Sequence, residues 1–198
     1  MTPTQSRLYL VTPEQIGEDQ LKSVFSAIVA AGDIAAVLVR ASTHEEKTAR
    51  AKLLAPLAHD HDIAILIDEE RSCVEISGAD GVHVMGTGNE FTKARELVGS
   101  DMIVGVSAGS SKHAAMEAAD AGADYVAFDD ASYAKWWAPL FEVPCVALGG
   151  ADEEMARELA LAGVEFICPD ETMWQEPDKA TRVVKRYCEI FAEIETSQ

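Results

Sequence analysis

The sequence is poor in basic residues and contains no long apolar run. It has 16 Lys and Arg against 34 Asp and Glu, which gives a formal net charge of -18. This charge excludes nucleic acid and anionic membrane surfaces as partners, because both would be repelled. No apolar stretch approaches the roughly 20 residues of a membrane-spanning helix, and residues 1–7 lack the basic start and apolar stretch of a secretory signal. We therefore expect a cytoplasmic protein that binds a small molecule.

Cysteines are few and far apart. The sequence has 4 of them, and no two form a CxxC pair. Two lie in apolar segments typical of strands, and the wide spacing gives no metal-binding or redox motif. We interpret all four as buried free thiols in a reducing compartment; they are Cys73, Cys145, Cys168 and Cys188.

A recurring pattern fills most of the chain. A helical segment ends at a glycine, an Ala or Val and an acidic residue follow, and a short apolar strand begins. The pattern is clearest at residues 78–84, 122–128 and 163–168. Strands this apolar have no face for water, so they are expected to be parallel and covered by helices. With no linker or low-complexity tract, residues 1–198 are predicted to form one domain, an α/β TIM (β/α)8 barrel.

The expected strands follow from the short apolar runs. They span residues 8–11, 35–39, 63–67, 81–84, 102–106, 125–128, 144–148 and 166–168. Thr43 with Glu46, Ser110 or Ser111, and Asp152 are predicted to cap the helices that follow three of these strands. The helix that starts near Thr43 is expected to bury Leu53, Leu54 and Leu57. In such a barrel, chemistry is expected where the strands end.

Several short strings resemble one family of barrels. They are Leu8-Tyr9-Leu10-Val11-Thr12, Gly78-Ala79-Asp80-Gly81-Val82-His83, Gly105-Val106-Ser107, Gly122-Ala123-Asp124-Tyr125-Val126 and the segment Pro144 to Gly150. Together these strings are similar to the thiamine phosphate synthase/TenI family over about residues 8 to 192. Enzymes of this family join hydroxymethylpyrimidine diphosphate to thiazole phosphate with Mg²⁺ and release pyrophosphate, and a sister branch aromatises the thiazole.

The resemblance implies a role for each of six residues. Arg40 would hold the diphosphate, and Asp68 and Glu69 would carry Mg²⁺, with Asp68 also contacting the substrate. Ser107 would act as the catalytic residue that helps bind the leaving group. Gly149 and Gly150 would receive the thiazole phosphate through their backbone N–H groups.

Near the expected phosphate sites, the sequence departs from the family pattern toward fewer basic and more acidic residues. Arg40 is retained after the second strand, but the loop after the sixth strand lacks the expected lysine. Acidic residues stand near the phosphate sites instead, namely Asp129, Asp130, Asp170 and Glu171, and their role is left open. Carboxylates beside a phosphate oppose its binding, so we expect weak or absent synthase activity. The alternatives are a catalytically inactive binding or regulatory homologue, and a metal-dependent enzyme acting on a non-phosphorylated small molecule.

Three other features have mainly structural interpretations. His59-Asp60-His61-Asp62 has metal-binding residue types, but it falls at the amino-terminal face of the barrel and is interpreted as a solvated loop. His83 lies in a strand, which favours a packed, hydrogen-bonded histidine. Helix packing is expected to explain at least one of Trp136 and Trp137, with stacking on a planar ligand as an alternative. An exposed Trp136–Trp137 face would instead indicate a homodimer.

Overall fold

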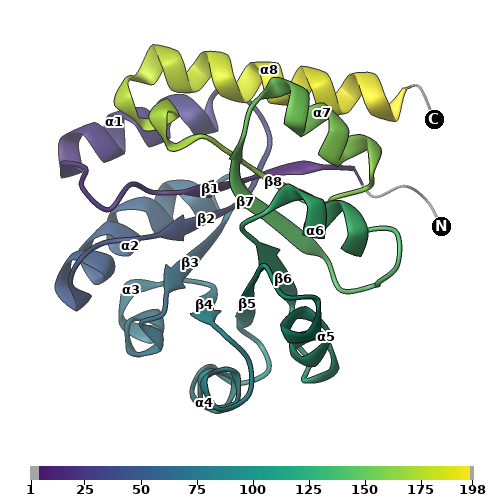
Figure 1. Cartoon of the computed structure of the whole chain (residues 1–198). Coiled ribbons are helices and arrows are strands. Elements are labelled where there is room, and N and C mark those ends of the chain that lie inside the picture. Colours follow the sequence, from purple (N-terminus) through teal and green to yellow (C-terminus); the bar gives the residue numbers. More distant parts are fainter. Residues whose placement is uncertain (1–4, 197–198) are drawn as a thin grey trace.

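The structure is a computed structural model that describes residues 5–196. Eight parallel strands pair in sequence order and close into a barrel, which confirms the predicted TIM barrel. Helices surround the strands, which converge at the centre of Figure 1. The strands are β1 (Arg7–Val11), β2 (Ile34–Val39), β3 (Ala64–Asp68), β4 (Gly81–Met85), β5 (Ile103–Gly109), β6 (Tyr125–Phe128), β7 (Cys145–Ala151) and β8 (Phe166–Pro169).

An outer ring of helices covers the barrel. The helices are α1 (Glu18–Val29), α2 (His44–His59), α3 (Val74–Ser77), α4 (Asn89–Val98), α5 (Lys112–Asp120), α6 (Ala131–Trp137), α7 (Glu153–Leu161) and α8 (Pro177–Glu195), with short 3-10 turns η1 (Arg71–Cys73) and η2 (Glu171–Gln175). Every residue of β2 and of β6 is buried. The helices therefore shield the strands from water on one side while barrel side chains fill the other, as parallel strands require.

Two strands run further toward the mouth of the barrel than predicted. β5 ends at Gly109 and β7 at Ala151, whereas the sequence suggested ends at residues 106 and 148. Each extension contains a shift in pairing register, between Ser107 and Gly109 and between Ala147 and Ala151. The added residues are mostly small, so the apolar pattern gave no sign of the continued strand.

The predicted helix caps are confirmed. The Thr43 hydroxyl accepts a hydrogen bond from the backbone N–H of Glu46 at 3.2 Å. Ser111, not Ser110, caps α5, and Asp152 caps α7. Each cap satisfies a backbone N–H that the first helical turn leaves without a partner.

The predicted buried face of α2 is partly wrong. Leu54 is buried, but Leu53 and Leu57 are only half-buried. The buried face instead includes Arg50, which is 6% exposed. A charged residue was not expected there, and its hydrogen bonds explain the exception below.

The barrel closes where the first and last strands meet. β1 and β8 pair through Arg7 with Phe166 and Leu8 with Ile167. Outside this seam α1 packs against α8. At the edge of the seam the Gln5 side chain donates to the Glu195 carboxylate at 3.0 Å. The two ends of the described chain therefore lie side by side.

The cysteines are free thiols, as predicted. Cys73, Cys145 and Cys168 are buried, and Cys188 is half-buried. Among residues 5–196, no helix is long and apolar enough to cross a membrane.

Candidate functional site

Arg40 lies at the carboxyl end of β2 and lines two cavities at the mouth of the barrel. The larger has a volume of about 510 Å³, and its walls include Thr12, Asp68 and Glu171. The smaller, of about 190 Å³, includes Gly150, Cys168 and the acids Asp129, Asp170 and Glu171. Arg40 and Glu171 belong to both. We call these two cavities the mouth site.

Asp68, at the end of β3, pairs with Arg40 across the mouth site. Arg40 Nε lies 3.4 Å from Asp68 Oδ2. Partial burial raises the pKa of the Asp68 carboxyl, and the nearby charges of Arg40 and Lys47 oppose that rise. The Lys47 ammonium also donates to the backbone carbonyl of Asp68 at 2.7 Å. Arg40 thus pairs with the Asp68 carboxylate, while Lys47 holds the Asp68 backbone next to the site.

The backbone of Arg40 is fixed by two neighbours. Its N–H donates to the Thr12 hydroxyl at 2.9 Å, and the same hydroxyl donates to the Arg40 carbonyl at 3.2 Å. The buried Arg50 guanidinium donates to that carbonyl at 2.6 Å and to the carbonyls of Pro13, Glu14 and Ile16. Arg50 therefore ties the loop after β1 to the end of β2. Sequence reasoning missed it because nothing local predicts four carbonyl partners for one side chain.

A buried polar network lies inside the barrel. The Tyr125 hydroxyl is 2.8 Å from His83 Nδ1 and 2.8 Å from the Tyr9 hydroxyl. The second ring nitrogen of His83, Nε2, is buried without a hydrogen-bond partner in the described part of the chain. Burial lowers the pKa of His83 to about 3, so its imidazole is neutral. The prediction of a packed, hydrogen-bonded histidine is confirmed.

Gly149 and Gly150 lie near the end of β7, inside its shift in pairing register. A Cβ on Gly149 would lie 2.5 Å from the Asp129 carbonyl oxygen, so only glycine fits there without a shift of the backbone. Gly150 has a φ of +67° and lies against Asp170. Both line a further cavity of about 180 Å³ toward α7, and Gly150 also reaches the mouth site. Glycine at these two positions thus lets the β7 backbone pass close to the Asp129 backbone, with the Asp170 carboxylate beside it.

Ser107 and Glu69 are not among the residues that line the two mouth cavities. Ser107 is 5% exposed within β5, and within residues 5–196 its hydroxyl makes no hydrogen bond to a histidine or a carboxylate. Glu69 is exposed, with a left-handed φ of 58°. Its backbone N–H donates to the His83 carbonyl at 2.7 Å. The roles that the resemblance implies for these two residues stay predictions.

The acidic residues divide into two groups. Asp129, Asp170 and Glu171 line the mouth site. The Asp130 carboxylate caps α6 by accepting from the Ser132 N–H, and this bond lowers its pKa. Asp170 accepts from the Thr172 N–H, which lowers its pKa in the same way. The lowered pKa keeps the Asp170 carboxylate charged at the wall of the mouth site near neutral pH.

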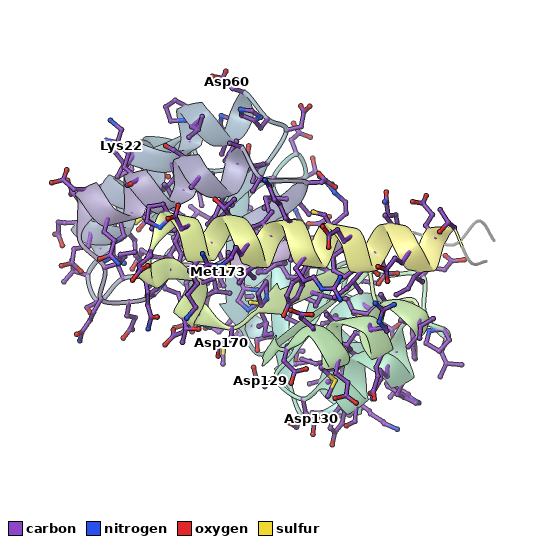
Figure 2. The ribbon with its side chains drawn as sticks, turned by 90° about the horizontal axis from the view of Figure 1, so that it is seen from above. Lys22, Asp60, Asp129, Asp130, Asp170 and Met173 are labelled. Atoms are coloured by element: carbon purple, nitrogen blue, oxygen red, sulfur yellow. The ribbon has the colours of Figure 1, made fainter. Side chains whose placement is uncertain are left out.

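Two sequence features lie away from this site. Asp60 lies at the opposite edge of Figure 2 from Asp129, Asp130 and Asp170. Its neighbour His59, the last residue of α2, pairs with Asp80 at 3.0 Å. Asp62 lies in the turn between α2 and β3, and its N–H donates to the His59 carbonyl. Trp137 is fully buried and stacks on Phe141 with ring centroids 3.8 Å apart. Trp136 and Trp137 therefore do not form the exposed face that would indicate a homodimer. The oligomeric state stays a prediction.

The fold is that of a (β/α)8 barrel protein, and its charged mouth is a candidate small-molecule site at the carboxyl ends of the strands. A family model described as thiamine monophosphate synthase matches residues 8–132. The chain belongs to the thiamine phosphate synthase family, as its sequence strings predicted.

Individual relatives agree with this assignment. The thiamine-phosphate synthase of Rhodospirillum centenum is 37% identical over 190 residues, covering 88% of this chain and 92% of that protein. That of Erythrobacter litoralis is 30% identical and covers 96% of each chain. The solved structure of thiamine phosphate pyrophosphorylase from Pyrococcus furiosus superposes with a TM-score of 0.80 at 20% identity, over 97% of this chain and 98% of that one. At that identity the superposition supports the fold.

Proposed function

We propose that this chain is a thiamine phosphate synthase that joins hydroxymethylpyrimidine diphosphate to thiazole phosphate, with its acidic mouth weakening the grip on both phosphorylated substrates. The observation that carries the proposal is Arg40, held by Thr12 and Arg50 at the point where the two mouth cavities meet. These bonds fix the backbone from which the Arg40 side chain extends, and its guanidinium is suited to bind a diphosphate through paired hydrogen bonds.

The reaction needs charge stabilisation more than proton transfer. The thiazole nitrogen supplies an electron pair that forms a bond to the methylene carbon of the pyrimidine. The carbon–oxygen bond to the diphosphate breaks, and pyrophosphate leaves with the bonding electrons. Arg40 would neutralise part of the charge that builds on the leaving oxygen. No residue has to remove a proton, which agrees with a Ser107 that lacks a histidine partner.

Magnesium fits this site through one carboxylate. Asp68 lines the larger mouth cavity, where its carboxylate oxygens are available beside Arg40. Mg²⁺ is commonly held by one or two carboxylates together with substrate phosphates. Asp68 would hold the ion, and Glu69, although adjacent in sequence, is exposed outside the two cavities. When bound, the metal would offset the negative charge of the diphosphate.

The acidic wall favours a second candidate, a binding protein without synthase activity. Three carboxylates, from Asp129, Asp170 and Glu171, share the smaller cavity with the single cation Arg40. Such a lining opposes a phosphate and favours a cationic or uncharged ligand. The same observation supports a metal-dependent enzyme for a non-phosphorylated molecule.

Pyrophosphate release from the two phosphorylated substrates with Mg²⁺ tests the proposal. We expect measurable release by the wild-type protein and a loss of about 100-fold in kcat/KM for Arg40→Met, the size expected for removing one charge-stabilising donor. Arg71→Met, which removes a half-exposed arginine paired with Glu90, should keep the wild-type rate. A melting temperature raised by either substrate without product would support the binding protein instead. Release unchanged in Arg40→Met would refute the assignment of Arg40.

The acidic wall can be tested in the same assay. Glu171→Gln removes a charge that borders both mouth cavities, so KM for the phosphorylated substrates should fall several-fold. A KM that rises would show that Glu171 helps hold the substrate or its metal.

A further inference from the structure

Three side chains that the proposed function does not use meet beside the barrel mouth. His44 opens α2 after β2, Glu70 follows β3, and Cys73 lies in η1. His44 Nδ1 is 3.3 Å from Cys73 Sγ and 3.6 Å from Glu70 Oε1. One ligating atom from each residue lies within 4.8 Å of the other two. A nitrogen, a sulfur and a carboxylate oxygen therefore surround one point.

The arrangement does not fit a cysteine nucleophile. A relay of thiol, imidazole and carboxylate uses both ring nitrogens, one facing the thiol and the other the carboxylate. Here the thiol and the carboxylate both approach Nδ1 of His44. The thiol also lies 3.6 Å from the His44 carbonyl, to which it donates. Three donor atoms that converge on one point fit a shared cation better than a chain of proton transfers.

We propose that His44, Glu70 and Cys73 form a binding site for a zinc ion. The chemistry is that of zinc, which binds sulfur, imidazole nitrogen and carboxylate oxygen together. Tetrahedral zinc with the usual bond lengths separates a sulfur from a nitrogen by about 3.6 Å and a nitrogen from an oxygen by about 3.4 Å. The observed separations of 3.3 and 3.6 Å need only small rotations to match.

The surrounding residues support the ligands. The Ser72 hydroxyl donates to Glu70 Oε1 at 2.6 Å, which orients the carboxylate. The Thr48 hydroxyl, one helical turn after His44, is buried and makes no hydrogen bond of normal geometry within residues 5–196. Burial raises the pKa of the Cys73 thiol, and the adjacent Thr48 hydroxyl partly offsets that rise. This hydroxyl is placed to donate to a metal-bound thiolate, as outer partners of zinc ligands do.

The zinc site would be separate from the magnesium site. It uses none of the residues that line the mouth cavities, and its half-exposed His44 and Glu70 leave a fourth position open to water. The ion would tie the start of α2 to the segment after β3. Lys47 lies in α2 and Asp68 ends β3, next to these two segments, so both would be held in place as a result.

Cobalt binding tests the proposal without reference to synthase activity. Purified, chelator-treated protein titrated with Co²⁺ should give one equivalent of a tetrahedral spectrum with a thiolate-to-cobalt charge-transfer band, and Zn²⁺ should abolish it by competition. Cys73→Ser should lose the charge-transfer band, and His44→Ala should weaken cobalt binding at least tenfold. Cys188→Ser and His113→Ala change a cysteine and a histidine far from the site, and both should bind as the wild type does.

Because Cys73 is buried, its substitution needs a companion that spares the core. Glu70→Gln alters a half-exposed side chain and should weaken cobalt at least tenfold while the circular dichroism spectrum stays unchanged. A wild-type protein without the charge-transfer band, or a band that persists in Cys73→Ser, would overturn the proposal. Either result would leave the proposed synthase activity untouched, since that activity is measured with Mg²⁺.

Discussion

Replacing Arg50 by methionine gives the sharpest test of how the mouth site is built. The Arg50 guanidinium is 6% exposed and donates to four backbone carbonyls at 2.6 to 3.2 Å. Methionine fills similar space but donates nothing, so these carbonyls lose their shared partner. Three of them belong to the loop after β1, and one belongs to Arg40.

The size of the effect follows from the number and kind of bonds. A hydrogen bond to a charged group contributes about 1.5–3 kcal/mol, and the four are not additive because loop carbonyls regain water once the loop moves. We expect a loss of about 3–5 kcal/mol in the free energy of unfolding, as for breaking a buried charged network. Such a loss is a large part of the roughly 5–15 kcal/mol that stabilises a domain.

Urea denaturation followed by tryptophan fluorescence would measure this loss. Arg157→Met, which removes an arginine paired with Glu193 at the surface, is the matched control and should cost about 0–1 kcal/mol. Arg50→Lys should fall between them, since an ammonium cannot present the same planar set of donors. A loss below about 1 kcal/mol in Arg50→Met would show that the loop does not depend on these bonds.

Three other variants or conditions follow from single contacts. Gly149→Ala would push a Cβ to 2.5 Å from the Asp129 carbonyl oxygen and should cost about 1–3 kcal/mol in urea denaturation. Gly17→Ala, with nothing within 4 Å but at the N-cap of α1, should cost less than about 1 kcal/mol. Tyr125→Phe removes the hydroxyl shared by His83 and Tyr9 and should cost about 1–3 kcal/mol, since it leaves buried groups without partners. Burial lowers the pKa of His83 from 6.5 to about 3, so below pH 6.5 the unfolded chain takes up a proton that the folded chain does not. The free energy of unfolding should therefore fall by about 1.4 kcal/mol for each pH unit below 6.5. A free energy of unfolding that stays constant between pH 7 and pH 5 would contradict this.

The fold was predictable because its signal is repeated. Eight apolar runs, five of them entered from a glycine, predict eight buried parallel strands, and all eight are present. Their carboxyl ends were less predictable. In β5 and β7 the last residues are small or glycine, and a shifted register rather than an apolar pattern continues the strand.

The site was predictable only where one residue type carries the chemistry. Arg40 and Asp68 were predicted from the resemblance, and the structure brings them to 3.4 Å from each other. Arg50 was missed because nothing in the sequence around it indicates that backbone carbonyls elsewhere in the chain would accept its hydrogen bonds. The trio His44, Glu70 and Cys73 was missed because 29 residues separate its ends and no spacing motif joins them. The one usable signal was that all three follow the adjacent strands β2 and β3.

The contact between Gln5 and Glu195 has a consequence for how freely the gene can be rearranged. Gln5, just before the first strand, is hydrogen-bonded to Glu195 at the end of the last helix. A short linker could therefore join these two segments, and new termini could be opened elsewhere. The exposed turn at residues 99–101, on the face opposite the mouth site, offers such an opening. Circular permutation of this kind succeeds at exposed turns. The eight βα units could then fold from a different starting point in the chain, because the closed barrel keeps the same contacts between neighbouring units.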